Sequence, residues 1–125
     1  MGGELKSTVC ILIEGKAVLS EHLGELPNAT AYRNFISTID QFKKLLRVDP
    51  EIIACDMHPA YAATRYARSL GLQLVEVQHH HAHIVSCMAD NNISGRVVGV
   101  ACDGTGYGTD GAIWGCEVLV CDEAD

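Results

Sequence analysis

Residues 72–83, LQLVEVQHHHAH, combine two patterns that together indicate the fold class. The first half, residues 72–77, is short and mostly apolar, which is typical of a core strand. The second half begins a segment, residues 79–90, that is predicted to be a helix ending at Asn91 and Asn92. A strand that leads directly into a helix is the repeating unit of an α/β domain.

Strands and helices also alternate on both sides of this stretch. A tight hairpin is predicted around Glu14 and Gly15, and residues 29–47 repeat apolar side chains as an amphipathic helix does, with Asn28 as its N-cap. Further elements are predicted as strands at residues 51–55, 96–102 and 112–121, and as a helix from Pro59 to Leu70. This order predicts an α/β fold with a mixed sheet covered by helices, in which ligands collect at the carboxyl ends of strands.

The composition excludes several classes of protein. The chain has 125 residues, of which 48% are hydrophobic, and a formal net charge of −7. The acidic balance argues against a protein that coats nucleic acid, because phosphates are held by a basic face. No apolar run approaches the ~20 residues of a membrane span, and no secretory signal opens the sequence. We therefore expect a soluble, cytoplasmic protein that binds neither nucleic acid nor membrane.

The six cysteines are predicted to be reduced. None of them forms a C-x-x-C pair, which argues against zinc ribbons and thioredoxin-like sites. Some stand among apolar residues typical of buried strands, where a free cysteine behaves as a small hydrophobic side chain. These cysteines are Cys10, Cys55, Cys102 and Cys121.

Four of the six histidines fall within residues 79–83. The run is internal and interrupted, so we do not interpret it as an expression tag. Positions i and i+4 of a helix share a face, so His79 and His83 could direct their imidazoles at one cation, and imidazole suits zinc, iron and nickel. Residue 80 is histidine and not glutamate, which argues against the protease pattern H-E-x-x-H. A polar helix start at the surface is the alternative to a metal site.

Residues 103–111, DGTGYGTDG, form a glycine-dense segment between two predicted strands. Three of the glycines match the dinucleotide fingerprint G-x-G-x-x-G, but a strand and not a helix is predicted to follow them. A calcium loop starting at Asp103 is excluded because its twelfth position is Trp114 and not glutamate. The segment therefore predicts a turn whose N–H groups meet phosphate oxygens beside a carboxylate. A flexible surface hairpin is the alternative.

Two further segments give a less specific signal. Residues 2–8 combine a glycine pair with a lysine and two hydroxyls, which could also meet phosphate. Asp56 and His58 follow a predicted strand, and we favour structural roles for both of them. Asp56 is expected to cap the next helix, and His58 is expected to be a polar loop residue.

Several of these stretches resemble one protein family in the same order along the chain. The segments are residues 2–6 (GGELK), 21–26 (EHLGEL), 54–59 (ACDMHP), 77–83 (VQHHHAH) and 103–117 (DGTGYGTDGAIWGCE). They look like the HypF carbamoyltransferases of nickel–iron hydrogenase maturation, and the resemblance runs over practically the whole chain. Cys116 departs from the family, which more often has a second glycine there. We expect this change to affect packing and not chemistry.

The resemblance implies a fold and a domain division. The chain is similar to the first half of the family's last module, which has the two-lobed fold of actin, Hsp70 and sugar kinases. Residues 1–95 would be the first, ribonuclease-H-like lobe, and residues 96–125 would be the opening β-hairpin of the second lobe. The family's acylphosphatase-like domain, zinc-finger motifs and carbamoyl-adenylate-forming domain have no counterpart in the sequence, and neither has the remainder of the second lobe.

The resemblance also implies a reaction. The family uses carbamoyl phosphate and ATP to form a carbamoyl-adenylate. The carbamoyl group then passes to the C-terminal cysteine of a partner, HypE, where dehydration gives the cyanide ligand of the hydrogenase iron. The implied ligands of a divalent metal, zinc or iron, are His79, His83 and Asp103, and Asp103 is also the catalytic carboxylate. The residues implied to line the nucleotide phosphates are Gly104, Thr105 and Gly106.

Further expectations concern the absent part of the second lobe. The isolated chain should be inactive as an enzyme. The alternative function is a non-catalytic metal- or partner-binding domain left by truncation. An isolated two-stranded hairpin is marginal in water, and unpaired edges and apolar faces recruit other chains. We therefore expect a homodimer formed through residues 96–121.

Overall fold

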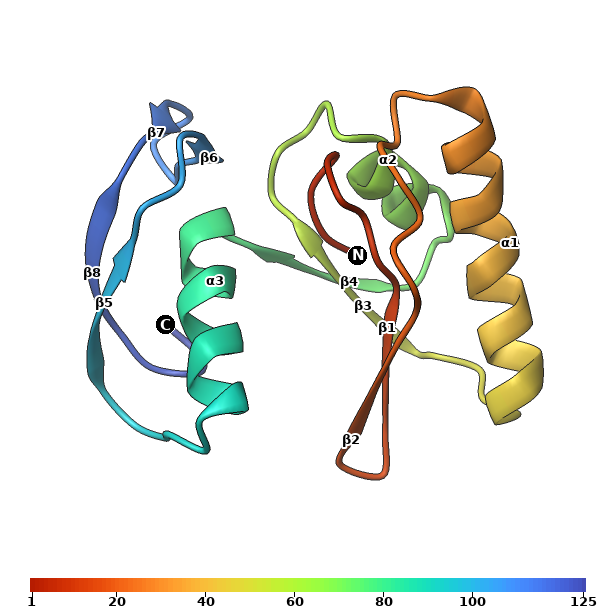
Figure 1. Ribbon diagram of the computed structural model, residues 1–125, viewed down its shortest axis with the longest axis horizontal. Coiled ribbons are helices and arrows are strands. Elements are labelled where there is room, and N and C mark those ends of the chain that lie inside the picture. Colours follow the sequence, from red (N-terminus) through yellow and green to blue (C-terminus); the bar gives the residue numbers. More distant parts are fainter. The chain divides into compact units, whose positions relative to one another are not determined.

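The computed structural model describes residues 1–125 and divides them into two compact units, Met1–Glu76 and Val77–Asp125. The secondary structure is α/β with three helices, but the strands form four two-stranded sheets in place of the single mixed sheet that we expected (Figure 1). The pairs are β1 (Cys10–Ile13) with β2 (Lys16–Leu19), β3 (Ile52–Asp56) with β4 (Gln73–Val77), β5 (Val97–Ala101) with β8 (Glu117–Cys121), and β6 (Gly106–Tyr107) with β7 (Ile113–Trp114).

Main-chain bonds join Met1 to β3. The Met1 amino group donates to the carbonyl oxygen of Ala54 at 2.8 Å, and the Asp56 N–H donates to the Met1 carbonyl oxygen at 3.2 Å. Met1 therefore occupies backbone groups of β3 that a neighbouring strand would otherwise use. The β1–β2 hairpin forms its own antiparallel ladder and turns at Glu14 and Gly15, whose φ angles of 48° and 74° fit a tight hairpin turn.

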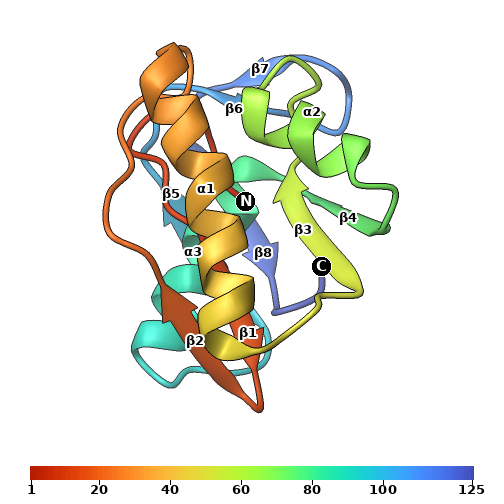
Figure 2. The same cartoon turned by 90° about the vertical axis from the view of Figure 1, so that its right-hand side faces the viewer.

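Helix α1 (Ala29–Leu46) begins where the sequence predicts. The Asn28 side chain accepts hydrogen bonds from the N–H groups of Thr30 at 2.9 Å and Ala31 at 3.2 Å, which satisfies two of the unpaired donors of a helix start. The helix ends at Arg47, which adopts the left-handed conformation with φ 55° before the predicted stop at Asp49. Figure 2 shows α1 along its whole length.

Aromatic packing on α1 forms the main core of the first unit. The side chain of Phe35 is completely buried, and its ring centroid lies 6.4 Å from that of Tyr32 and 5.9 Å from that of Tyr66. Tyr66 belongs to α2 (Ala62–Ser69), so these contacts join the two helices of the unit.

The start of α2 differs from the prediction. The predicted helix included Pro59, but α2 begins at Ala62, where the Glu4 carboxylate accepts a hydrogen bond from the backbone N–H. A side chain 58 residues earlier in the chain therefore supplies the cap. After the helix, Gly71 adopts φ 66°, in agreement with the predicted left-handed stop.

Asp56 closes a turn instead of capping α2. Its Oδ1 accepts a hydrogen bond from the His58 N–H at 2.8 Å, and the His58 ring stacks on Tyr61 with centroids 4.1 Å apart. The hydroxyl of Thr64 donates to the Asp56 carbonyl oxygen at 2.8 Å, which joins α2 to the end of β3. The role of Asp56 is therefore structural, as predicted, but the residue closes a turn and does not provide the expected helix cap.

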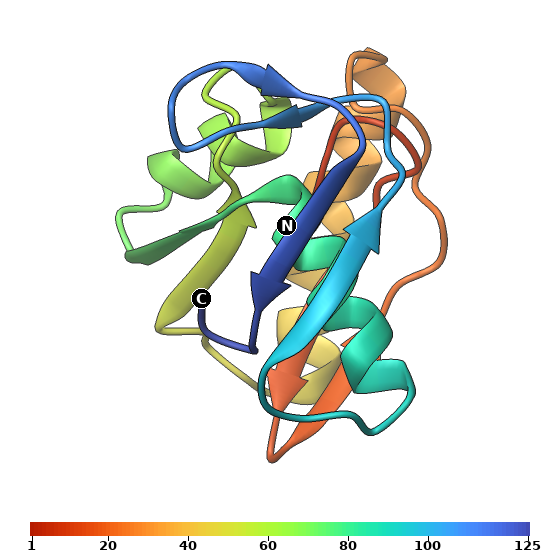
Figure 3. The ribbon, with the colours of Figure 1, turned by 90° about the vertical axis from the view of Figure 1, so that its left-hand side faces the viewer.

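In the second unit, α3 (His79–Asp90) packs against the antiparallel pair β5–β8 (Figures 1 and 3). Ile84 and Met88 of the helix are buried against Ala101 and Cys121 of the strands. A Cβ atom at Gly99 would lie 2.4 Å from Cδ1 of Ile84, so the absence of a side chain at this position makes room for Ile84 of the helix.

The predicted strand over residues 112–121 is divided into β7 and β8. Gly115 and Cys116 separate the two strands. Strand β7 pairs with β6, which lies inside the glycine-dense segment.

The predicted burial of cysteines is correct for two of the four, Cys55 and Cys121, whereas Cys10 and Cys102 are exposed. No helix combines the length and the apolar composition that a membrane span requires.

The Asn28 cap gives a direct test of the α1 boundary. Asn28→Ala should lower the free energy of unfolding by about 1 kcal/mol, because two N–H groups lose their acceptor. The matched control is Asn34→Ala on the exposed side of the same helix, which should change stability by less than about 0.5 kcal/mol. Urea denaturation of both variants measures the difference, and equal effects would contradict the capping role.

Candidate metal and phosphate site

The first turn of α3 places two imidazoles side by side. His79 and His83 are separated by four positions, so their side chains lie on one face of the helix. Their Nε2 atoms are 3.2 Å apart and their ring centroids 4.8 Å apart. The helical spacing that the sequence predicted therefore brings both nitrogens to one point.

Asp103 completes this cluster from the segment after β5. Its Oδ2 lies 3.0 Å from Nε2 of His79 and 3.4 Å from Nε2 of His83. All three predicted ligands belong to the second unit, and each offers one ligand atom to the same small volume. The packing of α3 on β5 is what joins two histidines and one aspartate that are 24 and 20 positions apart in sequence.

The separations of the three ligand atoms fit a metal ion. Zinc–nitrogen and zinc–oxygen bonds of about 2.1 Å place tetrahedral ligand atoms roughly 3.4 Å apart, and octahedral neighbours roughly 3.0 Å apart. The observed separations of 3.0, 3.2 and 3.4 Å span that interval. Two imidazoles and one carboxylate suit both zinc and iron, and three protein ligands leave coordination positions open for water or phosphate.

The charge of Asp103 is set by its immediate neighbours. Desolvation raises the pKa of the carboxyl group, but the Gly104 N–H, which donates to Oδ1 at 2.7 Å, and the contact with His79 outweigh it and lower the pKa overall. The carboxylate therefore stays ionised at neutral pH. The stability that it contributes is lost only as the pH falls through this lowered pKa.

The three residues predicted to line phosphates differ in their surroundings. Gly104 and Thr105 are exposed beside Asp103, whereas Gly106 is buried in β6. A Cβ atom at Gly106 would lie 2.8 Å from Nε2 of His80, so this glycine makes room for a buried imidazole. Gly104 and Thr105 are accessible to a ligand, and Gly106 has a packing role.

Gln78 is a positioning residue that the sequence reasoning missed. Its Oε1 accepts a hydrogen bond from the His81 N–H at 2.9 Å and caps α3, while its Nε2 donates to the Tyr107 carbonyl oxygen at 3.3 Å. It thereby holds the start of the histidine helix to β6. Glutamine is not among the preferred N-cap residues, so the only signal was its position directly before the histidine run.

His80 is the completely buried member of the histidine run. Neither of its ring nitrogens has a hydrogen-bond partner, and the ring packs beside Gly106. His81 lies half-buried, with Nε2 2.8 Å from the carbonyl oxygen of Asp122. These two histidines therefore face away from the cluster formed by His79 and His83.

Side-chain contacts hold the glycine-dense segment beyond Gly106. Asp110 Oδ1 accepts hydrogen bonds from the Ala112 N–H at 2.9 Å and from the indole Nε1 of Trp114 at 3.0 Å. The turn between β6 and β7 is thus bonded internally.

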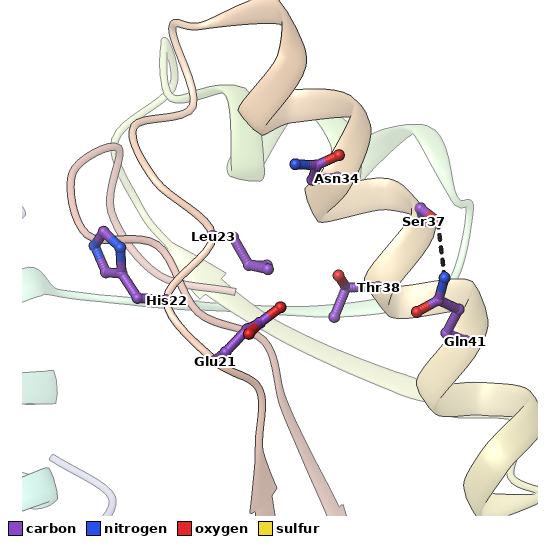
Figure 4. A pocket seen from close by; sticks show the side chains of 7 residues that line it. All are labelled: Glu21, His22, Leu23, Asn34, Ser37, Thr38 and Gln41. Carbon is purple, nitrogen blue, oxygen red and sulfur yellow. Dashed lines mark hydrogen bonds between the residues drawn. The ribbon is translucent and has the colours of Figure 1, made fainter.

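The remaining predicted features lie in the first unit. Ser7, within the glycine- and hydroxyl-containing residues 2–8, is buried and its N–H donates to the carbonyl oxygen of Gly24 at 3.1 Å, which indicates a structural role. A separate open pocket of about 250 Å³ contains none of the predicted site residues (Figure 4). Its lining residues are Glu21, His22, Leu23, Asn34, Ser37, Thr38 and Gln41.

Two family models match successive parts of the chain. The model described as the HypF Kae1-like domain matches residues 1–90. The model described as the second subdomain of the carbamoyltransferase Kae1-like domain matches residues 99–125. The compact units of the structure divide at Glu76, and the predicted domain boundary after residue 95 stays a prediction.

Individual relatives agree with these matches. The carbamoyltransferase HypF of Rhizobium leguminosarum bv. viciae is 46% identical over 121 residues, which are 97% of this chain and 16% of the relative. That of Synechocystis sp. is 44% identical over 120 residues, with 95% and 16% covered. The chain thus spans about one sixth of the length of these relatives.

Solved structures give the same result for the fold. A crystal structure of full-length HypF in the phosphate- and nucleotide-bound form superposes with a TM-score of 0.94 at 55% identity, covering 97% of this chain and 16% of that one. The structure of HypF from T. kodakarensis gives 0.89 at 40% identity, with 95% and 16% covered. The sequence resemblance is confirmed, and the chain belongs to the HypF Kae1-like domain family.

Proposed function

We propose that this chain is the metal- and nucleotide-binding front part of an ATP-dependent carbamoyltransferase module. The observation that carries the proposal is the convergence of three ligand atoms, from His79, His83 and Asp103, beside exposed Gly104 and Thr105. The relatives that match the chain are named carbamoyltransferases, and one matching structure is described as phosphate- and nucleotide-bound. In the whole protein, the substrates would be carbamoyl phosphate and ATP, and HypE would accept the carbamoyl group.

The residues of this chain would have separate tasks in that reaction. His79, His83 and Asp103 would hold a zinc or iron ion, which when bound supplies positive charge opposite nucleotide phosphates. Thr105 would offer its hydroxyl to phosphate oxygens, and Gly104, whose N–H holds Asp103, would leave them room beside the carboxylate. Gln78 would keep α3 in place, so that the imidazoles stay oriented toward Asp103. The six free cysteines support a cytoplasmic location for this activity.

The metal site gives the first test of the proposal. After the exposed thiols are alkylated, because thiolates also bind zinc, the chain should bind about one Zn²⁺. His79→Ala and His83→Ala should each weaken binding by more than about 10-fold, since the loss of a supporting residue alone costs about 10- to 100-fold. The matched control is His22→Ala, an exposed histidine of the first unit, which should bind zinc as the wild type does. Calorimetry measures all four affinities.

Zinc affinity should also depend on pH in one direction. Imidazole must be neutral to bind a metal, so affinity should fall between about pH 7.5 and about pH 5.5 as protons compete for the ring nitrogens. Asp103 does not contribute to this fall, because its lowered pKa keeps the carboxylate ionised over the whole interval. A flat profile, or two histidine variants with unchanged affinity, would contradict the site.

The second test concerns turnover. The chain covers 16% of its relatives, so we expect it to lack part of the reacting site and to be inactive alone. Purified chain should show no ATP cleavage that depends on carbamoyl phosphate and no carbamoyl transfer to HypE. A turnover that Asp103→Asn abolishes would show that the chain carries more of the active site than we propose. Metal binding without turnover is also the property of the alternative, a non-catalytic binding domain.

The outer face of β5 and β8 supports a homodimer of this chain through residues 96–121. Four valines on that face form two cross-strand pairs in the antiparallel register, and each of these residues is 62–70% exposed. The pairs are Val98 with Val120 and Val100 with Val118. An apolar face of this kind is covered most simply by the same face of a second copy, which closes a two-fold contact.

Charge on that face should prevent dimer formation. Val98→Lys should shift the chain from dimer to monomer in size-exclusion chromatography with light scattering, because association would bury the new ammonium groups. Val75→Lys is the matched control, since Val75 is also an exposed strand valine but lies in the first unit. A wild-type monomer at high micromolar concentration would contradict the dimer.

A further inference from the structure

Two cysteines face each other where β5 and β8 end. The antiparallel register pairs Ala101 with Glu117, and its continuation by one position places Cys102 opposite Cys116. The two sulfur atoms are 3.3 Å apart, with the Cys116 thiol donating to Cys102. Of the six cysteines, only these two lie within hydrogen-bond distance of each other.

The position of this pair suits a covalent link. A disulfide bond is about 2.05 Å long, so the sulfurs need to approach by only about 1.3 Å, a movement that side-chain rotation can supply. Both cysteines are exposed in the single chain, so a dissolved oxidant can reach them in the monomer. Cys10 and Cys87 are exposed as well, but neither has a second thiol beside it.

We propose that Cys102 and Cys116 are a redox-sensitive pair that forms a reversible intrachain disulfide. The oxidant is a small-molecule disulfide such as glutathione disulfide. The thiolate of one cysteine attacks the oxidant, forms a mixed disulfide and releases one glutathione thiolate. The second cysteine then attacks the protein sulfur of that mixed disulfide and releases the other glutathione. The protein loses two protons and two electrons, and the oxidant is reduced to two molecules of glutathione.

The proposed disulfide would lie next to the glycine-dense segment and to Asp103 in the second unit. The disulfide encloses residues 103–115, so the glycine-dense segment becomes a covalently closed loop. Cys102 directly precedes Asp103, and the link therefore fixes the backbone from which the Asp103 carboxylate extends. The proposal needs only the two thiols and does not depend on a bound metal, so its outcome is separate from that of the proposed function.

The experiment uses the reduced 125-residue chain with an excess of glutathione disulfide. After acid quenching and alkylation of remaining thiols, digestion on the N-terminal side of aspartate separates Cys102 from Cys116. The expected product is residues 90–102 linked to residues 110–121, and fragmentation in the mass spectrometer assigns the bond to Cys116 and not to Cys121. Dithiothreitol should return both peptides.

Serine variants test the two-step exchange itself. Cys116→Ser should keep a glutathione adduct on Cys102, and Cys102→Ser should keep one on Cys116, because neither variant has a second thiol to displace it. The matched control Cys87→Ser, which removes an exposed cysteine elsewhere in the unit, should form the same cross-link as the wild type. Circular dichroism confirms that all three variants are folded.

The contrary results are equally specific. A wild-type chain that ends with glutathione adducts on both Cys102 and Cys116 would overturn the proposal. The same holds if Cys102 is linked chiefly to another cysteine or to a second chain. Equal adduct retention in the wild type and in the two serine variants would likewise show that the thiols do not resolve each other.

Discussion

The close approach of α3 to β5 is the constraint on which the candidate site depends. Gly99 has no side chain, and a Cβ atom in its place would lie 2.4 Å from Cδ1 of Ile84. The helix can therefore rest directly on the strand, and the chain that leaves β5 brings Asp103 to the first turn of the helix. Because protein interiors are close-packed, a larger residue at Gly99 would have to displace the Ile84 side chain of the helix.

The electrostatics of the cluster follow from the same packing. Asp103 accepts a hydrogen bond from the Gly104 N–H and faces both His79 and His83. Contacts of 3.0–3.4 Å between these nitrogen and oxygen atoms can be bridged either by protons or by a metal ion. Protons and a metal ion would therefore compete for the same three atoms, so metal binding at the site would depend on pH.

The two faces of the β5–β8 ladder have different surroundings. Alternate side chains of a strand point to opposite faces, so one face packs on Ile84 and Met88 of α3 while the valines of the other face stay exposed. At its end, the ladder leads into the paired thiols of Cys102 and Cys116 and then into Asp103. Core packing, the proposed association and the proposed redox chemistry thus all involve this pair of strands.

The sequence by itself determined the features that depend on neighbouring residues. The cap of α1 at Asn28, and the shared face of His79 and His83, follow from local hydrogen bonding and helical period. Only the tertiary structure decided that Glu4 caps α2, that the strands form separate pairs, and that Asp103 meets the imidazoles. The contacts of Glu4 and Asp103 join residues 20 to 58 positions apart, and no local period or propensity encodes which distant groups will meet.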